Sequence, residues 1–427
     1  MSWDITAIKM KSYVGWVKAR VKMLSVEKIS YLAIAASPGA FKICVLAAVG
    51  VLSDRVGVQG EIANDLAIIS FVSMLTAIGA GLRLLHLIPK EKDSREQSAK
   101  LLKGAIIKLC PFIVLTCVAI YFSSTFGFDI LNNGKESAVL LFAVSIYWLF
   151  RHFFLARANK TKLIALELLL WSVTVAGFAV IYLQESFSSP NVTLIIAGAY
   201  LISIFPELIS LSKVSANYDF DILKDSLLLG LSNLVSGGLV SLAPSIAYHT
   251  GGPALAGIIA LISNILSITL TAIRAYLLKS TPLISDVLAT KNGFKEVKRK
   301  VQRGINIIML VCSLALLPLA VLTVIKVQAG ADVLTVAIYS LSITAFICIP
   351  QFAAVSSLAM AFIGSSGLML GINIIQSALV FMCTSIAFYY MEPHVVFPVF
   401  LCSFALFNLF RNYIVTLAVL KVCRHKF

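Results

Sequence analysis

Apolar runs of about twenty residues recur along the whole chain, separated by short segments in which charged residues collect. A helix rises about 1.5 Å per residue, so such a run crosses the roughly 30 Å of hydrocarbon in a bilayer. The alternating apolar and polar positions of a membrane β-barrel are absent. The pattern predicts twelve membrane-spanning helices, near residues 31–52, 63–87, 104–123, 136–156, 162–184, 191–212, 225–248, 253–278, 304–325, 332–357, 366–390 and 395–421.

Composition agrees with this pattern, because 59% of the residues are hydrophobic and only 13% are charged. These values exclude an ordinary soluble domain and indicate an all-α integral membrane protein. The formal charge of +15 could suggest a nucleic-acid partner. However, the basic residues collect in alternate connections, which is a topology signal rather than a binding surface. We therefore expect no nucleic acid, and we expect both termini in the cytoplasm.

Other sequence features narrow the class further. The eight cysteines lie in apolar runs or near the basic C-terminus, so we expect free thiols. No phosphate-binding glycine loop, metal-ligand cluster or nucleophile-and-base arrangement is present, so we expect neither an enzyme nor a bound cofactor. Coupling to a proton or sodium gradient is compatible with the sequence, but no residue identifies the ion. Residues 1–29 interleave apolar and basic side chains, as in an amphipathic helix on an anionic membrane surface or a solvated leader.

Two of the predicted helices carry a similar polar stripe at helical spacing. The later stripe is Asn264, Ser267, Thr271 and Arg274, and the earlier one, 191 residues before it, is Ser73, Thr76, Ala80 and Arg83. The same offset relates Lys42 to Asn233, in a weaker match between the first and seventh helices. These matches predict two pseudo-twofold-related six-helix bundles. The expected division is a leader (1–29), a first lobe (30–212), a cytoplasmic linker (213–225) and a second lobe (226–427).

Lys42 lies about eleven residues into its predicted helix, or about 16 Å deep. A lysine near the centre of a bilayer costs about 2.5–3.5 kcal/mol on insertion scales. One interpretation is a cation that faces an aqueous lumen and attracts an anionic cargo, and this is the interpretation we favour. The alternative is a structural ion pair with Glu167 or Glu207.

The other intramembrane polar residues also have two interpretations each. Arg83 and Arg274 lie near helix ends, where arginine either reaches lipid headgroups or presents a two-pronged donor to a phosphate group. Arg151 and Arg411 interrupt apolar helices and either extend the cation set or pair with Glu207. A third group could hydrogen-bond sugar hydroxyls or bridge helices, and it comprises Asn264, Asn373 and Gln376.

One connection carries a motif that resembles a known family. Residues Tyr276 to Asp286 contain a proline, an apolar pair and a serine, and a basic amphipathic segment follows from Lys291 to Arg299. This pattern is similar to that of the multidrug/oligosaccharidyl-lipid/polysaccharide (MOP) superfamily of exporters, and the layout of twelve helices resembles its O-antigen (Wzx-type) flippase branch. Pro253 to Gly257 and Val58 to Gly60 are similar to further loose motifs. The Gly-Pro turn common after the first helix is replaced by Asp54 to Gly57.

The resemblance implies two bundles in a V, with a cationic cavity lined by the first, second, seventh and eighth helices. The implied cargo is an oligosaccharide linked to a polyprenyl diphosphate such as undecaprenyl diphosphate, an O-antigen or other surface polysaccharide repeat unit. It would cross from the inner to the outer leaflet of a bacterial inner membrane by alternating access. The implied partners are membrane lipid and the polysaccharide polymerase and chain-length machinery. Two other hypotheses stay open: a multidrug exporter of the same superfamily, and a membrane-embedded polysaccharide polymerase or ligase.

Overall fold

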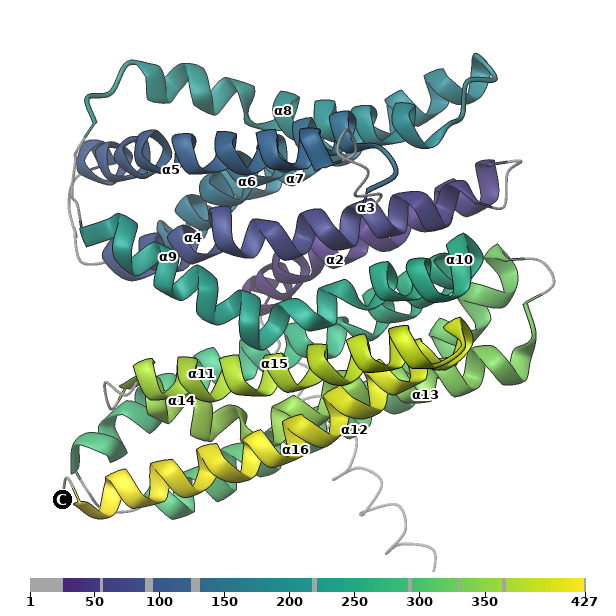
Figure 1. Ribbon diagram of the computed structural model, residues 1–427. Helices are drawn as coiled ribbons and strands as arrows, with labels where there is room; N and C mark the ends of the chain where they lie inside the picture. The colour runs from purple at the N-terminus through teal and green to yellow at the C-terminus, as the bar shows by residue number, and fades with distance from the viewer. Residues whose placement is uncertain are drawn as a thin grey trace, which may run out of the picture.

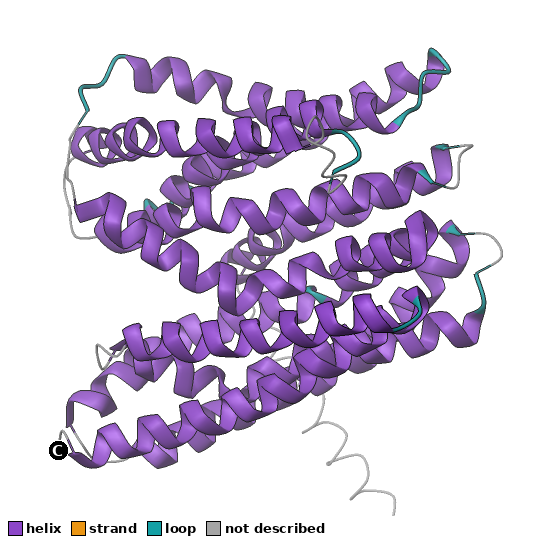
Figure 2. Ribbon diagram, viewed as in Figure 1, coloured by secondary structure: helices purple, strands orange, loops and turns teal. Residues whose placement is uncertain are grey.

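The computed structural model describes residues 26–425, apart from 54–56, 89–94, 124–130, 217–220, 291–293, 329–330 and 363–365. Most of the predicted leader therefore lies outside the described residues. Every regular element in the described part of the chain is a helix (Figure 2). The predicted all-α class is confirmed, and the reason is that a chain in lipid must satisfy its backbone hydrogen bonds within each segment.

The first half of the chain runs to Ser212. Its elements are α2 (Val26–Leu52), α3 (Val58–Ser73), the π-helical turn η1 (Met74–Ile78), α4 (Gly79–Leu87), α5 (Arg95–Ser123), α6 (Gly134–Ala156), α7 (Lys160–Leu183) and α8 (Ser189–Ser212).

The second half contains shorter segments as well as long helices. Its elements are α9 (Asp221–Asn233), the π-helical turn η3 (Leu234–Gly238), α10 (Leu239–Leu266), α11 (Ile268–Thr290), α12 (Phe294–Val327), α13 (Val333–Cys348), the 3₁₀ turn η4 (Ile349–Ala353), α14 (Ala354–Phe362), α15 (Ser366–Tyr390) and α16 (Pro393–His425).

Ten helical stretches of the described chain are long and apolar enough to span a membrane, and a shorter apolar stretch lies in α2. One of the ten, Leu239–Leu277, is 39 residues long and contains two helices that meet at Gly252. Gly252 has a φ of 80°, in the left-handed region that glycine adopts without strain, and Pro253 begins the next helix. Dividing this stretch at Gly252 and adding α2 gives twelve passes, in agreement with the sequence prediction.

The helices form two groups that lie one above the other in Figure 1. The upper group holds α3 to α8 and also α9, which packs against α4, and the lower group holds α11 to α16. The two groups meet chiefly where α3 packs along α10. In the upper group α6 is the most enclosed span, because 78% of its apolar stretch is buried. In the lower group only 17% of the apolar stretch of α12 is buried. The exposed apolar surface of α12 is expected of a helix that faces lipid.

The contact between the two halves of the chain depends on glycines at both of its ends. A side chain on Gly60 would place its Cβ 1.9 Å from the carbonyl oxygen of Pro253, and one on Gly79 would come within 2.1 Å of the carbonyl oxygen of Ser226. Helices approach this closely only where no side chain intervenes. We call the end that carries Gly60 the Gln59 end. The other, which carries the starts of α5 and α12 and the end of α8, is the basic end, on the left in Figure 1.

The 191-residue offset also relates two irregularities of the backbone. The π-helical turn η1 corresponds by this offset to residues 265–269, and the helix is interrupted there at Ser267, between α10 and α11. Both irregularities fall within the polar stripes identified in the sequence. A π-helical turn adds a residue to the helix and redirects the side chains that follow.

Candidate functional site

A pocket with a volume of about 80 Å³ lies between α2, α3 and α10, where the two halves meet. Most of its lining is apolar or small. Its polar lining residues are Lys42, Ser70, Ser241, Ser263 and Asn264. Lys42 is the only ionisable group in the described lining, so this part of the pocket carries a positive charge and no acid.

Lys42 is half-buried on α2 and points across the pocket wall to α3. Its Nζ donates to the Ser70 hydroxyl at 2.5 Å, and that hydroxyl donates to the carbonyl of Leu66 at 2.5 Å. Neither Glu167 nor Glu207 lies beside it, because each of these acids has another basic partner. The ion-pair alternative for Lys42 is therefore wrong, and the ammonium is held by a neutral hydroxyl at the pocket.

Asn264 and Ser263 bring amide and hydroxyl groups to the same pocket from α10. The Asn264 side chain donates to the carbonyl of Ala260 at 2.8 Å. The Ser263 hydroxyl is buried and has no hydrogen-bond partner within the described structure. Buried hydroxyls usually have a partner, so this oxygen is available to a ligand or to water.

The remaining residues of the two stripes lie outside the described lining of this pocket. Arg274 on α11 is exposed. Arg83 on α4 and Asn233 at the end of α9 are half-buried.

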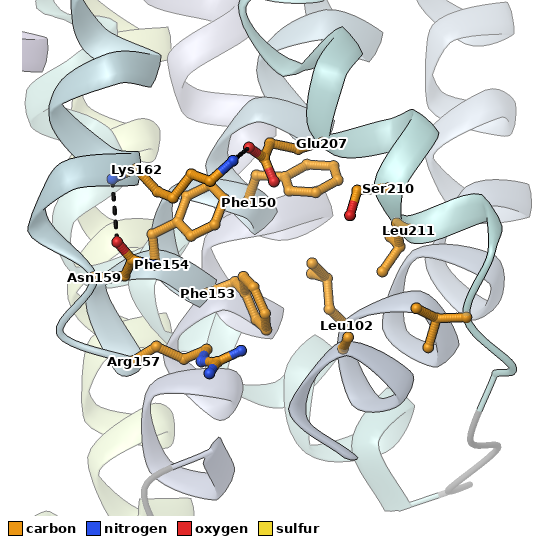
Figure 3. Close-up of a pocket in the computed structure, with 12 residues that line it drawn as sticks. Leu102, Phe150, Phe153, Phe154, Arg157, Asn159, Lys162, Glu207, Ser210 and Leu211 are labelled. Atoms are coloured by element: carbon orange, nitrogen blue, oxygen red, sulfur yellow. Dashed lines mark hydrogen bonds and ion pairs between the residues drawn. The ribbon is translucent and has the colours of Figure 1, made fainter. Parts of the chain in front are cut away.

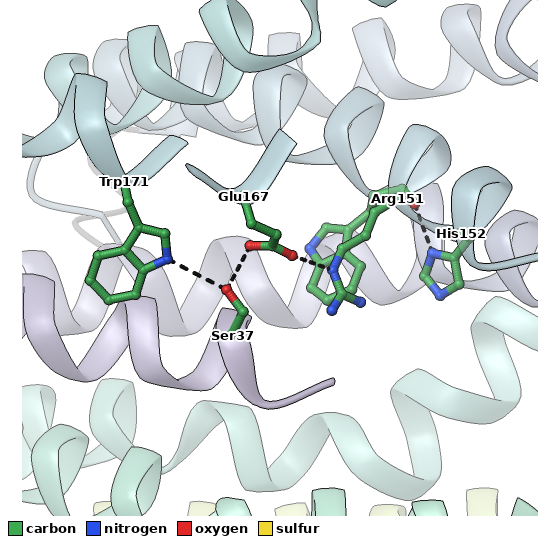
Figure 4. A network of polar contacts seen from close by, with 6 residues as sticks. Ser37, Arg151, His152, Glu167 and Trp171 are labelled. Carbon is green, nitrogen blue, oxygen red and sulfur yellow. Dashed lines mark hydrogen bonds and ion pairs between the residues drawn. The ribbon is translucent and has the colours of Figure 1, made fainter. Parts of the chain in front are cut away.

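Arg151 lies inside the first half, in a network shown in Figure 4. Its Nε donates to one oxygen of Glu167 at 2.9 Å, and the Ser37 hydroxyl donates to the other oxygen at 2.8 Å. Trp171 Nε1 donates to the same hydroxyl at 3.4 Å. Arg151 and Glu167 are both buried, so the ion pair ties α6 to α7 and, through Ser37, to α2. Arg151 pairs with Glu167, so of its two interpretations the pairing with Glu207 is wrong.

Glu207 instead pairs with Lys162 near the basic end of the first half. The two charged atoms are 2.5 Å apart, at the edge of a pocket of about 60 Å³. Figure 3 shows Phe150, Phe153 and Phe154 on the wall of this pocket. Because Lys162 is largely exposed, the pair contributes little to stability.

Arg411 lies inside the second half and is held by neutral groups. Its Nε donates to Asn373 Oδ1 at 2.7 Å, its Nη1 to Asn412 Oδ1 at 3.2 Å and its Nη2 to Ser357 Oγ at 3.5 Å. Nothing in the described chain pairs this buried guanidinium with a carboxylate, so the alternative in which Arg411 pairs with Glu207 is wrong as well. Gln376, one helical turn from Asn373, is buried, and neither atom of its amide has a partner within the described chain.

The sequence prediction missed a buried carboxylate, Asp65 on α3. It is 1% exposed and accepts hydrogen bonds from the backbone N–H of Asn132 at 3.1 Å and from Asn133 Nδ2 at 3.0 Å. The predicted helix began at residue 63, which placed this acid at the membrane edge. In the structure α3 begins at Val58, so Asp65 lies two turns inside. The signal that could have revealed this site was an acid, Asp65, two residues inside the predicted apolar span.

The described part of the chain contains no cluster of three or more His, Cys, Asp or Glu residues that could hold a metal ion. The fold and the pocket together define a class: a multi-pass membrane protein with two helical bundles and a polar pocket between them. The chain matches no known protein-family profile and no curated protein sequence.

Solved structures with this fold are transporters. A multidrug resistance MATE family transporter of the MOP superfamily in an inward-facing conformation matches with a TM-score of 0.65 and 13% identity, over 89% of this chain and 94% of that one. An outward-facing conformation of such a transporter gives a TM-score of 0.55 at 13% identity, over 92% and 94%. A MOP superfamily transporter from Pyrococcus furiosus matches with a TM-score of 0.56 and 12% identity, over 92% of this chain and 94% of that one. For that transporter, a reverse polarity of the binding pocket has been taken to suggest a different function. The chain therefore has the fold of MATE transporters of the MOP superfamily.

Proposed function

We propose that the protein is a flippase for an anionic lipid, in which a polyprenyl diphosphate carries an oligosaccharide such as an O-antigen repeat unit. The observation that supports this most directly is the pocket between the halves, which has Lys42 and no acid in its described lining. A diphosphate needs countercharge to leave water, because an isolated charge in a low-dielectric interior is very costly. The hydroxyl that holds Lys42 is uncharged, so it does not neutralise the ammonium.

The surroundings of the pocket support an anionic cargo. Arg274 is exposed on α11, and a guanidinium donates to phosphate oxygens in a two-pronged geometry. Asn264 and the unpaired Ser263 hydroxyl supply uncharged groups of the kind that hydrogen-bond sugars. Arg83 would receive the phosphate at the mouth, as the sequence analysis expects.

A multidrug exporter is the second candidate, because the fold is equally compatible with it. A pocket for cationic drugs requires acids, whereas the described lining here holds a lysine. The words used for the Pyrococcus furiosus transporter connect pocket polarity with a change of function in the same fold. Pocket charge is therefore the feature on which we choose between the two candidates.

The contacts between the halves at the Gln59 end support entry of the cargo from the opposite end. At the Gln59 end the halves are joined by a hydrogen bond from Gln328 Nε2 to Gln59 Oε1 (2.7 Å) and by one from the Tyr248 hydroxyl to Asn132 Oδ1 (2.6 Å). α11 packs mainly against α12 and also contacts α2 and α14. With the basic end in the cytoplasm, as the positive-inside rule predicts, the lipid would enter from the inner leaflet of a bacterial inner membrane. Release at the outer leaflet would supply the polysaccharide polymerase and chain-length machinery.

The proposal is tested with the full chain in vesicles that contain a fluorescent polyprenyl-diphosphate oligosaccharide, by measuring how fast the label reaches the opposite leaflet. Lys42→Ala and Arg274→Ala should each slow transfer about 10- to 100-fold, because each removes a charge-assisted contact of about 1.5–3 kcal/mol. Lys326→Ala removes the same charge from an exposed position at the end of α12 and is the matched control.

If Lys42→Ala and Arg274→Ala both transferred the lipid at the wild-type rate, with equal amounts of protein in the vesicles, the result would contradict the proposal. Transport of a cationic dye by the wild-type chain, with no movement of the lipid, would favour the multidrug exporter. Conversion of the lipid-linked sugar into longer chains would instead indicate a polymerase or ligase.

A further inference from the structure

Asp65 is a buried carboxylate surrounded by neutral groups. It lies seven residues inside α3, about 10 Å from the start of the helix at the Gln59 end. Both of its oxygens accept hydrogen bonds from uncharged donors, the Asn132 N–H and the Asn133 amide. Asn133 also donates to the Ser189 hydroxyl at 2.5 Å, which fixes its position against α8.

The other buried carboxylate of the first half differs in its partner. Glu167 is neutralised by Arg151 at 2.9 Å, whereas the described structure shows no ion pair at Asp65. Burial disfavours the charged form of a carboxylate, and an adjacent cation restores it. Only Glu167 has that adjacent cation.

The charged and titratable groups around Asp65 come from four elements. Glu61 is one turn away on α3, and Tyr248 approaches on α10. The first turn of α6, which starts beside Asn133, carries Lys135 and Glu136, and α2 contributes Lys42, which contacts α3 deeper at Ser70. None of the described cations among these groups forms an ion pair with Asp65. The net influence of its nearest carboxylate neighbour, Glu61, is repulsive.

Asp65 is linked to the contact between the two halves through one residue. Asn132 donates its backbone N–H to Asp65 and accepts, on its side-chain Oδ1, the hydrogen bond from the Tyr248 hydroxyl of the second half. Its side-chain Nδ2 also lies 3.5 Å from the Glu61 carbonyl. The charge on Asp65 therefore holds in place the residue that joins the halves at the Gln59 end.

We propose that Asp65 is a proton-binding site that controls the closure of the Gln59 end. The ionised carboxylate accepts two hydrogen bonds and holds Asn132 where Tyr248 reaches it. A proton from solvent converts one oxygen into a donor that faces other N–H donors, so one of these hydrogen bonds is lost and the contact with Tyr248 loosens. The inference deepens the proposed function by naming its coupling ion, and it rests on that function only for the direction of transport.

The donor set favours a proton over a metal cation. Both carboxylate oxygens face N–H groups, and a sodium ion would have to displace these donors to reach the oxygens. A proton needs no further ligands. The tightly packed seam beside this site also leaves little room for an ion, because Gly60 touches the Pro253 backbone.

The test measures the distance between the halves in the full chain without any substrate. Spin labels on bio-orthogonal amino acids at Lys135 (start of α6) and Val333 (start of α13) leave the native cysteines in place, and both positions are exposed. Pulsed electron resonance in lipid nanodiscs should show a separated population that grows at least about fivefold from pH 8 to pH 5, a change of about 1 kcal/mol. Asp65→Asn, which is isosteric with the protonated acid, should show the separated population at both pH values.

Glu61→Gln is the matched control, because it removes the same charge one turn away and leaves the Glu61 carbonyl in place. It should keep the pH response. Tyr248→Phe removes only the hydroxyl that bridges the halves, so this variant should show the separated population at both pH values. It tests the proposal even if Asp65→Asn folds poorly. Replacing the sodium salt of the buffer by a potassium salt should change nothing.

A wild-type pH response in Asp65→Asn or in Tyr248→Phe would overturn the proposal, as would a distance distribution that does not change with pH. Loss of the pH response in Glu61→Gln would show that Glu61 contributes to it, which contradicts its assignment to Asp65 alone. A response to sodium at constant pH would overturn the choice of the proton. Because no lipid cargo is present, failure of the flippase assay and failure of this test are distinguishable.

Discussion

Among the described residues each half buries one arginine, Arg151 in the first and Arg411 in the second, and the two halves stabilise the charge differently. In the first half Glu167 neutralises Arg151 at 2.9 Å. In the second half Asn373 and Asn412 accept hydrogen bonds from Arg411, and the positive charge remains. Both solutions satisfy the donors of a buried guanidinium, but only the first cancels the charge.

This difference shows that hydrogen-bond satisfaction and charge neutralisation are separate requirements inside a membrane protein. A polar group in a bilayer must be hydrogen-bonded, whereas a net charge is tolerated where a functional interior benefits from it. The charge that remains at Arg411 has the same sign as Lys42 and Arg274. Fixed charges of one sign in a low-dielectric interior attract counter-ions over a distance, which is consistent with an anionic cargo.

The largest expected effect comes from Glu167→Leu. The substitution leaves Arg151 buried without its counter-ion and also removes the acceptor of the Ser37 hydroxyl. Breaking a buried pair from one side costs about 3–5 kcal/mol. Titration of the folded fraction with a denaturing detergent in mixed micelles would measure the loss.

Glu207→Gln is the control for that measurement, because its partner Lys162 is largely exposed. We expect a cost of about 0–1 kcal/mol. If the two variants lost equal stability, the first-half pair would be no more important than an ion pair at the surface.

An intermediate effect is expected from Arg411→Met. Here no carboxylate is left behind, and the cost arises from Asn373 and Asn412, whose buried oxygens lose their donor. Unsatisfied buried acceptors cost about 1–3 kcal/mol. The same detergent titration applies, and a loss greater than that of Glu167→Leu would reverse the comparison between the halves.

The smallest effect is expected when both members of the first-half pair become apolar, in Arg151→Met with Glu167→Leu. Replacing a buried ion pair by apolar residues of similar volume is often neutral or stabilising, and we expect a change within about 1 kcal/mol of the wild type. The double variant should therefore be more stable than Glu167→Leu alone. If the two losses added instead, the side chains would act independently of one another.

The membrane passes were predictable from sequence because each apolar run is long enough to cross the bilayer without help from its neighbours. The boundaries were less predictable. We expected the ninth span to begin at residue 304, but α12 begins at Phe294, since its first turns pack Phe294 and Val301 into the core of the second half. At α3 an error of five residues concealed Asp65.

The site was predictable only in part. The helical spacing of Asn264 and the depth of Lys42 singled out two residues that line the same pocket. The partner of Arg151 was not predictable in this way, because Glu167 and Glu207 are equally plausible acids in the sequence. Helix packing places Glu167 at 2.9 Å and leaves Glu207 to Lys162.

The sequence by itself determined that this is a membrane protein of many apolar helices with cations in unusual places, because the cost of transfer into lipid depends on each segment alone. Only the tertiary structure decided which of those cations are neutralised and which face a pocket. It also decided that Asp65 connects, through Asn132, to Tyr248 in the other half. Coulombic and hydrogen-bond energies depend on distances of a few ångströms between residues that lie from 16 to 116 positions apart, and those distances are set by packing.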